Sequence, residues 1–433
     1  MSAPARPPEG GAPSLGEDVA QRQEGRPVSA PARPPEGGAP SLGEDVAQRQ
    51  EGRPVIAPAR PLNAHDLRRL ARRRLPRLAF DYLDGGAEDE TTLKANRRAF
   101  ENVALRPRAL RDVSVRAQSI EILGQMWSSP FGIAPVGLAG LFWPHGDVAA
   151  ARAAARAGVP YVLSTASSST LEAVAQVGGN LWFQLYVIER GLADSLVDRA
   201  LAAGYRHLVL TTDVPVSGRR ERDLRNGFSL PMRWRLGTVW DVVRHPRWLL
   251  QMARHGAPQL ANLAAAAATS GTQAQAALLQ RRMDASFAWE DLRRLRRRWP
   301  HALWLKGILH ADDARRACAE GVDGVIVSNH GGRQLDGAMA SLDALPEVVE
   351  AAGGRPVLLD GGVRRGVDVV KAMASGARGV LMGRLPMYGL AAGGEAGVAA
   401  ALELVRQDVD RTLALLGCDD VARLGPEWQI KLK

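Results

Sequence analysis

A histidine and an arginine lie three residues apart in the segment Ser328-Asn329-His330-Gly331-Gly332-Arg333. His330 follows a strongly apolar run and precedes two glycines, which let the backbone approach a bound molecule closely. A buried core histidine is the ordinary interpretation, but the glycine pair argues against it. A base beside a cation suits removal of a proton from an anionic substrate. We expect Asp213 to orient the imidazole and to stabilise its charged form, as the acid of a catalytic triad does.

Lys306 is a second candidate, because the chain has only five lysines among its 56 lysines and arginines. It directly follows the apolar run Ala302-Leu303-Trp304-Leu305. A lysine there is a flexible point charge that suits either a Schiff-base nucleophile or the stabilisation of negative charge. A surface lysine at the start of a loop is the simpler alternative. An aldolase that uses Lys306 therefore stays open as a competing hypothesis.

Short apolar runs alternate with helix-like segments from Phe131 onward. Two N-terminal helices are expected before them, one through residues 67–75 and one over 80–90 that the pair Gly85-Gly86 breaks. Eight such runs in series predict an α/β fold, a closed parallel (β/α)8 TIM barrel. The last helix is expected over residues 394–416. The expected strands are residues 131–135, 160–164, 181–186, 207–212, 302–306, 323–327, 356–360 and 379–382.

Glycine-rich stretches follow the last two expected strands. Asp360-Gly361-Gly362 and Gly383 are followed by Arg364 and Arg384. In such barrels the functional groups lie at the C-terminal ends of the strands. Either stretch alone is typical of a tight turn, but both together predict a phosphate site made of backbone N–H groups and a helix N-terminus.

The first 60 residues are expected to be a disordered tail ahead of a barrel domain over 61–433. Residues 2–28 and 29–55 repeat one 27-residue sequence that has few large apolar side chains, so it cannot offset its ordering entropy. No run approaches the ~18 apolar residues of a transmembrane helix, and no secretory signal is evident. The two cysteines are too few for a disulfide framework, so we expect a cytoplasmic protein.

The net charge of +10 comes almost entirely from arginine. The arginines are scattered evenly along the chain, which favours genomic composition bias as the cause of their excess. Attraction to an anionic partner is the alternative explanation. A nucleic-acid-binding protein is not expected, because that function leaves the polar groups at the strand ends unexplained.

Residues 328–336, with Asp360-Gly361-Gly362-Val363-Arg364-Arg365-Gly366 and Gly383-Arg384, resemble the FMN-dependent 2-hydroxy acid oxidase and dehydrogenase family. The resemblance runs from about residue 60 to the C-terminus. It implies that Arg220 and Arg333 hold the substrate carboxylate, which suits the guanidinium fork. The other residues that it assigns to catalysis or substrate binding are His330 as the base, Asp213 as its carboxylate partner, and Tyr82 and Tyr186 as hydrogen-bonding groups.

The same resemblance implies FMN as the cofactor and no metal. Lys306 would lie beside the N1/O2 edge of the flavin and stabilise the anionic reduced ring. The family also implies a homotetramer and, for its mandelate-oxidising members, electron transfer to a membrane quinone. The further cofactor-binding residues are Pro135, Val136 and Gly137 along the ring, Ser164, Gln184 and Thr211 as polar contacts, and Ser328, Asp360, Gly362, Arg364, Gly383 and Arg384 toward the ribityl and phosphate groups.

The substrate expectation depends on Ala166, which matches a tryptophan position of the glycolate-oxidising members. A small residue there leaves room for a phenyl group. Residues 181–188, 220–224 and 283–287 are most similar to the mandelate-oxidising members, although Val136 stands where those have threonine. We therefore expect oxidation of (S)-mandelate to phenylglyoxylate. L-lactate oxidation to pyruvate is the alternative, and an oxidase that uses oxygen comes third.

A long insertion after the fourth strand, residues 226–283, contains seven arginines, one aspartate and three tryptophans. Basic groups interleaved with tryptophan suit a segment that lies on an anionic membrane surface. An active-site lid is the alternative for a loop of this length. The resemblance favours peripheral binding to the inner face of the cell membrane.

Overall fold

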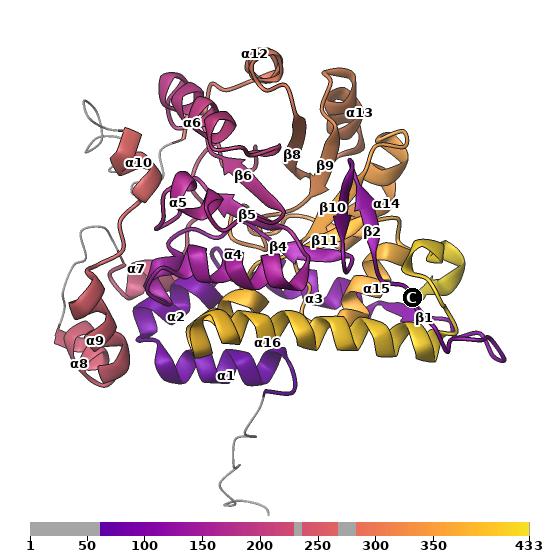
Figure 1. The fold of residues 1–433 in the computed structure, drawn as a ribbon, viewed down its shortest axis with the longest axis horizontal. Helices are drawn as coiled ribbons and strands as arrows, with labels where there is room; N and C mark the ends of the chain where they lie inside the picture. Colours follow the sequence, from indigo (N-terminus) through magenta and orange to yellow (C-terminus); the bar gives the residue numbers. More distant parts are fainter. Residues whose placement is uncertain (1–60, 229–235, 267–282, 433) are drawn as a thin grey trace, which may run out of the picture. The chain divides into compact units, whose positions relative to one another are not determined.

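The computed structural model describes residues 61–228, 236–266 and 283–432, which include a closed barrel of eight parallel strands (Figure 1). Each barrel strand pairs with the next along the chain, and β11 closes the ring on β4. The predicted (β/α)8 fold is confirmed, and only β8 runs beyond its expected range. The strands are β4 (Phe131–Ile133), β5 (Tyr161–Ser164), β6 (Leu181–Leu185), β7 (His207–Thr211), β8 (Ala302–Ile308), β9 (Gly324–Val327), β10 (Val357–Asp360) and β11 (Gly379–Met382).

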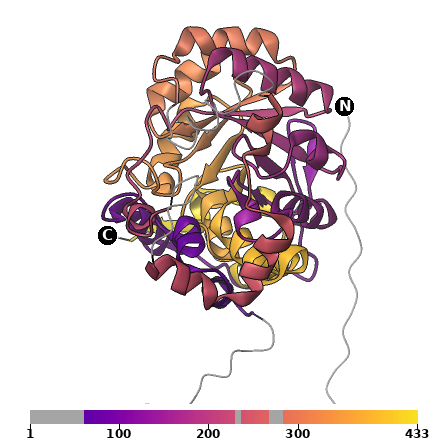
Figure 2. The ribbon, with the colours of Figure 1, turned by 90° about the vertical axis from the view of Figure 1, so that its left-hand side faces the viewer.

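The barrel strands are continuous apolar runs because both of their faces are covered. Phe183 of β6 and Leu208 of β7 are paired in register and fully buried. Helices surround the strands in Figure 2, so no face of the barrel sheet alternates between apolar and polar side chains. This burial leaves the strand ends as the places where polar side chains gather.

Aromatic rings fill the end of the barrel where the strands begin. The ring centroid of Trp182 lies 4.4 Å from that of His207 and 5.0 Å from that of Trp304. Trp304 Nε1 donates a hydrogen bond to His207 Nδ1 at 3.0 Å, and burial lowers the pKa of His207 to about 4. His207 is therefore a neutral packing residue, and the opposite end of the barrel is the open one.

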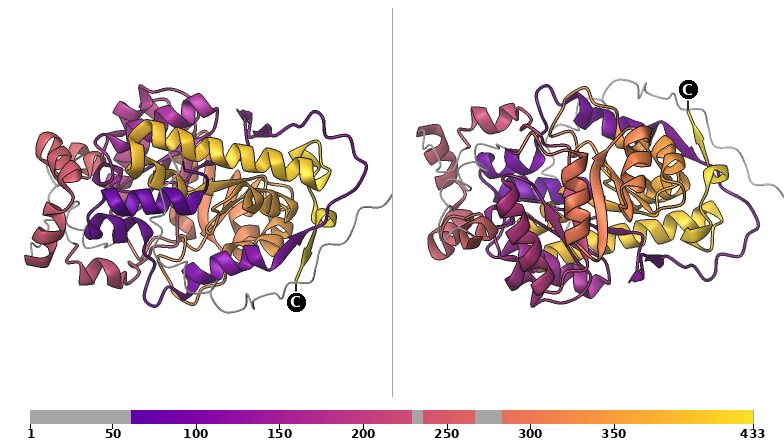
Figure 3. Two further views of the ribbon diagram at one scale, coloured as in Figure 1. Left: turned by 90° about the horizontal axis from the view of Figure 1, so that it is seen from below. Right: turned by 90° about the horizontal axis from the view of Figure 1, so that it is seen from above.

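The outer helices return the chain from the end of one strand to the start of the next. The expected last helix begins at the kink in α16, where Gly393 and Gly394 have non-helical backbone angles. Figure 3 shows the long α16 lying along α1. The helices that follow barrel strands are α4 (Gly146–Ala157), α5 (Leu171–Ala175), α6 (Arg190–Ala202), α12 (Trp289–Arg298), α13 (Ala311–Ala319), α14 (Ser341–Ala351), α15 (Gly366–Ala374) and α16 (Arg384–Leu416).

Three helices precede the barrel: α1 (Ala64–Arg74), α2 (Arg77–Asp84) and α3 (Thr91–Glu101). The Asn63 side chain caps α1 by accepting a hydrogen bond from the Asp66 N–H at 3.0 Å, as the sequence indicates. The break expected at Gly85-Gly86 is observed, because α2 ends at Asp84. Residues 85–90 form a loop rather than further helix, and the loop begins with Gly85 in an extended conformation.

Short strands outside the barrel were not expected from the sequence. β1 (Val103–Leu105) pairs antiparallel with β12 (Gln429–Lys431), and β2 (Ile120–Ile122) pairs antiparallel with β3 (Gln125–Trp127). Each has three residues, which is too short for a reliable hydrophobic pattern.

The insertion after β7 contributes helices α8 (Leu236–Val243), α9 (Pro246–His255) and α10 (Ala261–Ala266), after the short α7 (Glu221–Arg225). Trp248 of α9 is buried and donates a hydrogen bond to the Leu141 carbonyl at 2.8 Å. None of the helices in the described part of the chain is long and apolar enough to cross a membrane. The predicted tail, residues 1–60, and two parts of the insertion, 229–235 and 267–282, lie outside the described residues.

Candidate active site at the mouth of the barrel

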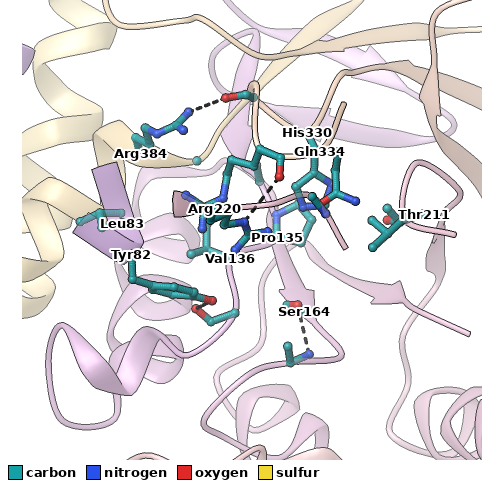
Figure 4. Close-up of a pocket in the computed structure, with 18 of the residues that line it drawn as sticks. Tyr82, Leu83, Pro135, Val136, Ser164, Thr211, Arg220, His330, Gln334 and Arg384 are labelled. Atoms are coloured by element: carbon teal, nitrogen blue, oxygen red, sulfur yellow. Dashed lines mark hydrogen bonds between the residues drawn. The ribbon is translucent and has the colours of Figure 1, made fainter. Parts of the chain in front are cut away.

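A cavity of about 460 Å³ lies at the C-terminal ends of the strands (Figure 4). It is bounded by the loops after β4, β5, β7, β9, β10 and β11 and by α2. Most of the residues predicted for the site line it, namely Tyr82, Pro135, Val136, Gly137, Ser164, Ala166, Tyr186, Thr211, Arg220, Lys306, His330, Arg333, Asp360, Gly362, Arg364, Gly383 and Arg384.

The three remaining predicted residues lie one layer behind this lining. Asp213 Oδ1 is 2.8 Å from His330 Nδ1, and Gln184 Oε1 accepts a hydrogen bond from Ser164 Oγ at 3.0 Å. Ser328 Oγ accepts hydrogen bonds from Lys306 Nζ at 2.8 Å and from the His330 N–H at 3.0 Å. The structure therefore brings all the predicted site residues together around one cavity.

His330 is held with one ring nitrogen toward an acid and the other toward the cavity side. Its backbone φ is +58°, in the left-handed region that non-glycine residues rarely adopt. Burial lowers the pKa of His330 below its ordinary value, and the Asp213 carboxylate opposes that shift. A neutral imidazole that donates from Nδ1 to Asp213 leaves Nε2 as an acceptor, 3.2 Å from the Tyr186 hydroxyl.

The charges of Asp213 and Tyr186 are set by the same surroundings. Burial raises the pKa of the Asp213 carboxyl, but the neighbouring His330, which donates a hydrogen bond to it, and the Lys306 charge outweigh burial and hold that pKa below the ordinary value. Burial, with Asp213 adding to it, raises the pKa of Tyr186 far above its usual range. Near neutral pH, Asp213 is therefore an anion and Tyr186 is a protonated hydroxyl that can donate a hydrogen bond.

Lys306 is a buried cation rather than a nucleophile. Its Nζ lies 3.1 Å from Asp360 Oδ2 and its side chain is 3% exposed. Burial alone would lower the pKa of Lys306, but Asp360 and Asp213 hold it above the ordinary value. A Schiff-base enzyme needs a neutral amine, so this environment argues against the aldolase hypothesis.

Two arginines and a tyrosine form a further part of the cavity lining. The Tyr82 hydroxyl donates to the Gly137 carbonyl at 3.3 Å, and the Arg333 guanidinium lies 5.3 Å from the centre of the Tyr82 ring. Arg220, the residue before α7, donates from Nε to the Arg333 carbonyl at 3.5 Å. Two guanidinium groups beside one cavity suit the binding of a carboxylate.

Several buried polar atoms that face this region have no hydrogen-bond partner in the described part of the chain. They are Gln184 Nε2, Thr211 Oγ1, Asp213 Oδ2 and Arg384 Nε. Buried polar atoms are nearly always paired in folded proteins. A cluster of such atoms around a cavity therefore indicates a bound polar molecule that satisfies them.

The far end of the cavity suits a phosphate group. Arg384 is 8% exposed, and burial together with the nearby Arg364 charge lowers its pKa to about 10. Gly362 has a φ of +83°, and a Cβ there would lie 2.5 Å from the Asn96 carbonyl oxygen, so only glycine fits. An anion beside Arg364 and Arg384 would relieve the repulsion between them.

Residues 71–431 match the model of the FMN-dependent dehydrogenase family. The chain belongs to that family. The cofactor of this FMN-dependent dehydrogenase is FMN, and the partnerless polar atoms and the paired arginines fit a group with a polar ring edge at one end and a phosphate at the other.

Known relatives of this FMN-dependent dehydrogenase cover most of the chain. An (S)-mandelate dehydrogenase from Pseudomonas putida is 54% identical over 367 residues, which are 84% of this chain and 93% of that protein. An L-lactate dehydrogenase from Caulobacter vibrioides is 45% identical over 83% of this chain and 95% of that one. A solved structure of (S)-mandelate dehydrogenase, described as a monotopic membrane protein, matches with a TM-score of 0.83 and 53% identity, over 86% of this chain and 99% of that chain.

Sequence reasoning missed the apolar side of the cavity of this FMN-dependent dehydrogenase. Phe228 stacks on Tyr82 with ring centroids 4.8 Å apart, and Leu260 and Met283 line the same region. These three residues lie in or beside the insertion, where no local pattern connects them to the barrel. Gln334, which donates to the Asp213 carbonyl at 3.1 Å, was also missed, although it lies within the recognised segment 328–336.

Proposed function

We propose that this FMN-dependent dehydrogenase oxidises (S)-2-hydroxy acids to 2-keto acids, and (S)-mandelate to phenylglyoxylate in preference to L-lactate to pyruvate. The observation that carries the proposal is the arrangement of His330. One ring nitrogen contacts Asp213 at 2.8 Å, and the other is directed toward a cavity that Arg220 and Arg333 also line. A base and a carboxylate-binding pair are the two groups that oxidation of a hydroxy acid requires.

In this mechanism His330 Nε2 accepts a proton from the substrate, and Asp213 stabilises the imidazolium that forms. Arg220 and Arg333 bind the carboxylate and orient the hydroxyl-bearing carbon, and Tyr82 and Tyr186 donate hydrogen bonds to the substrate oxygens. When bound, FMN would take up the two electrons and the second hydrogen that the substrate loses. Lys306 supplies a fixed positive charge against the negative charge of the reduced cofactor.

Residues in or directly after all eight barrel strands would hold FMN. The orphaned Gln184 Nε2 and Thr211 Oγ1 would contact the ring, and Arg364 and Arg384 would bind the phosphate. The ring would lie against the backbone after β4. The whole proposed set is Pro135, Val136, Gly137, Ser164, Gln184, Thr211, Lys306, Ser328, Asp360, Gly362, Arg364, Gly383 and Arg384.

The preference for mandelate rests on the apolar part of the cavity. Ala166 and Gly137 leave space beside the base, and Phe228 and Tyr82 offer an aromatic wall. A phenyl ring fills such space with favourable apolar burial, which the methyl group of lactate cannot match. The (S)-mandelate dehydrogenase relative supports this substrate, and the L-lactate dehydrogenase relatives favour lactate as the second candidate.

Anaerobic reduction of the bound flavin by separate 2-hydroxy acids tests the proposal. We expect (S)-mandelate to bleach the flavin absorbance faster than L-lactate, and the (R)-acids to be inactive. An Ala166→Leu variant should lose about 10- to 100-fold in kcat/KM for mandelate and less for lactate, since its side chain occupies the phenyl space. Equal kcat/KM for both acids in the unchanged enzyme would overturn the mandelate preference.

We further propose a membrane quinone as the electron acceptor and the insertion as the membrane contact. Apolar side chains on α8 and α9 are exposed, including Trp240 at 62% and Leu250 at 49%. The monotopic (S)-mandelate dehydrogenase supports a peripheral placement, which we propose to be at the inner face of the cell membrane. We also propose that the enzyme is a homotetramer.

An oxidase that uses oxygen is the alternative, and a structurally similar mandelate oxidase (TM-score 0.71, 42% identity) is a precedent for it. Hydrogen peroxide release in air at the rate of mandelate turnover would favour this alternative.

A further inference from the structure

One backbone carbonyl accepts hydrogen bonds from two functional arginines. The Gly85 oxygen, in the loop between α2 and α3, accepts from Arg333 Nη1 at 2.7 Å and from Arg384 Nη2 at 2.9 Å. Arg384 Nη1 also donates to the Gly331 carbonyl, next to His330, at 2.9 Å. The loop over residues 85–90, which we call the α2–α3 loop, therefore contacts both the proposed carboxylate site and the proposed phosphate site.

The α2–α3 loop also pairs with the backbone beside each substrate arginine. The Ala87 N–H donates to the Gly332 carbonyl at 2.9 Å, directly before Arg333. The Glu88 N–H donates to the Arg219 carbonyl at 2.8 Å, directly before Arg220. This loop thus holds the backbone directly before both substrate arginines.

Arg222 of α7 fastens the loop from the outside. Its Nη1 lies 3.1 Å from Asp84 Oδ2 and 3.8 Å from Asp81 Oδ1, and its Nη2 donates to Glu90 Oε2. Glu90 Oε1 in turn accepts from the Gly86 N–H at 2.8 Å. Arg222 therefore connects α7, which begins directly after Arg220, to both ends of the loop that holds Arg333. Figure 1 shows α7 beside α2.

Asp84, one of the carboxylates that Arg222 contacts, is charged. Burial raises the pKa of Asp84, but hydrogen bonds from Arg68 and Tyr388 outweigh it and hold that pKa at about 2. Burial lowers the pKa of Arg222, but Glu90 and Asp84 hold it above the ordinary value. Asp84 keeps Arg68, at 2.6 Å, and Tyr388, at 2.7 Å, when Arg222 is removed, so the fold retains its anchor there.

We infer that Arg222 is a positioning residue for substrate binding: its ion pairs with Asp84 and Glu90 set the distance between Arg220 and Arg333 to fit one carboxylate. This inference rests on the proposed function, because it assigns the carboxylate to those two arginines. Arg222 is not one of the residues that line the cavity, and it acts through the helix and loop that it joins.

The test is an Arg222→Gln holoenzyme compared with Arg225→Gln. Arg225 lies on the same helix, is 69% exposed and pairs with Glu221, so it controls for loss of a charge on α7. We expect Arg222→Gln to raise KM for (S)-mandelate by about tenfold or more with a smaller fall in kcat, because carboxylate binding is weakened in ground state and transition state alike. Arg225→Gln should leave both constants unchanged.

Binding of phenylacetate, which has the carboxylate but no hydroxyl to oxidise, gives a second measurement through the change that it causes in the flavin spectrum. Its Kd should rise in Arg222→Gln by the same factor as KM for (S)-mandelate. The double variant with Glu90→Gln should show little further rise in Kd. Arg222→Lys keeps the charge but loses the guanidinium fork. Its KM and its Kd for phenylacetate should lie between those of the unchanged enzyme and those of Arg222→Gln. This variant serves as the test if Arg222→Gln loses FMN.

The possible failures are distinguishable. If the unchanged enzyme is not reduced by any 2-hydroxy acid, the proposed function is wrong. If it is reduced, and Arg222→Gln keeps its FMN with KM and the phenylacetate Kd unchanged, the positioning inference is wrong. A fall in kcat alone, with unchanged phenylacetate binding, also contradicts it.

Discussion

His330 and Asp213 form a pair whose charges can be followed by pH. Burial keeps the imidazole neutral to lower pH than usual, while the buried carboxylate stays ionised beside it. A base must be unprotonated to work, and its lowered pKa extends the working range toward acid.

The first prediction concerns the acid side of the pH profile. The kcat/KM for mandelate should fall as pH drops through a pKa below about 6.5, the ordinary histidine value, since protonation removes the base. Asp213→Asn removes the charge that raises the His330 pKa, so that limb should move to still lower pH, and kcat should fall by roughly 10²- to 10⁴-fold. Steady-state kinetics from pH 4.5 to 9 measure both effects, and unchanged turnover in Asp213→Asn would remove the pair from the mechanism.

The second prediction concerns Phe228, which stacks on Tyr82 at 4.8 Å. Phe228→Ala should lower kcat/KM for mandelate by about 10- to 100-fold through the lost aromatic contact, and change that for lactate much less. Leu224→Ala is the control, because Leu224 lines the same cavity but is 58% exposed. An equal loss for both substrates would show that Phe228 supports the site as a whole rather than its specificity.

Site residues could be predicted from sequence where they follow a strand directly. His330, Lys306 and Asp360 each end or follow an apolar run, and the barrel brings such positions to one mouth. Phe228 and Met283 could not be found this way, because they reach the cavity from an insertion whose path no periodicity determines. The glycine-rich stretches after β10 and β11 predicted the phosphate end of the cavity. They could not predict that the Gly85 carbonyl, far away in the sequence, accepts hydrogen bonds from Arg333 and Arg384.

At the scale of elements, the barrel strands were predictable because burial on both faces makes each a continuous apolar run. β1 and β12 were not, because they pair across most of the chain with three residues each. The pair Gly85-Gly86 marked the break after α2, but the sequence did not show that the residues beyond it form a loop. Tertiary contacts to Gly332 and Arg219 hold that loop in place.

The third prediction concerns the exposed apolar side chains of α8 and α9. Trp240→Ser with Leu250→Ser should weaken binding to vesicles of anionic phospholipid by at least about tenfold, since each buried side chain of this size contributes about 1.5–3 kcal/mol. Vesicle sedimentation measures this partition. Leu110→Ser with Met126→Ser is the control, because those side chains are at least as exposed but lie outside the insertion. Equal binding by all variants would contradict the proposed membrane contact.

At the scale of the whole molecule, bound FMN should increase the free energy of unfolding of the barrel domain. Strands from all around the barrel contribute to the cavity, and FMN that binds only the folded state shifts the unfolding equilibrium. A free FMN concentration of 100 times Kd adds about 2.7 kcal/mol to the free energy of unfolding.

The fourth prediction follows from the two arginines at the phosphate end. FMN added to the apoprotein should raise Tm more than riboflavin at the same concentration, since riboflavin has no phosphate to relieve the repulsion between Arg364 and Arg384. Arg364→Gln should narrow the difference in Tm between the two flavins. Arg378→Gln should not, because Arg378 is an exposed arginine directly before β11, at the opposite end of the barrel. Equal shifts for the two flavins would place the phosphate elsewhere.

The Gly85 carbonyl has a consequence for how this enzyme can vary. Because the acceptor that joins Arg333 to Arg384 belongs to the main chain, no exchange of one amino acid at position 85 deletes it. A side chain there is resisted for another reason, since a Cβ would lie 2.7 Å from the Asp81 carbonyl oxygen. Side chains that line the substrate part of the cavity can therefore be exchanged while the Gly85 carbonyl still accepts hydrogen bonds from Arg333 and Arg384. We expect such exchanges to change substrate specificity without loss of FMN.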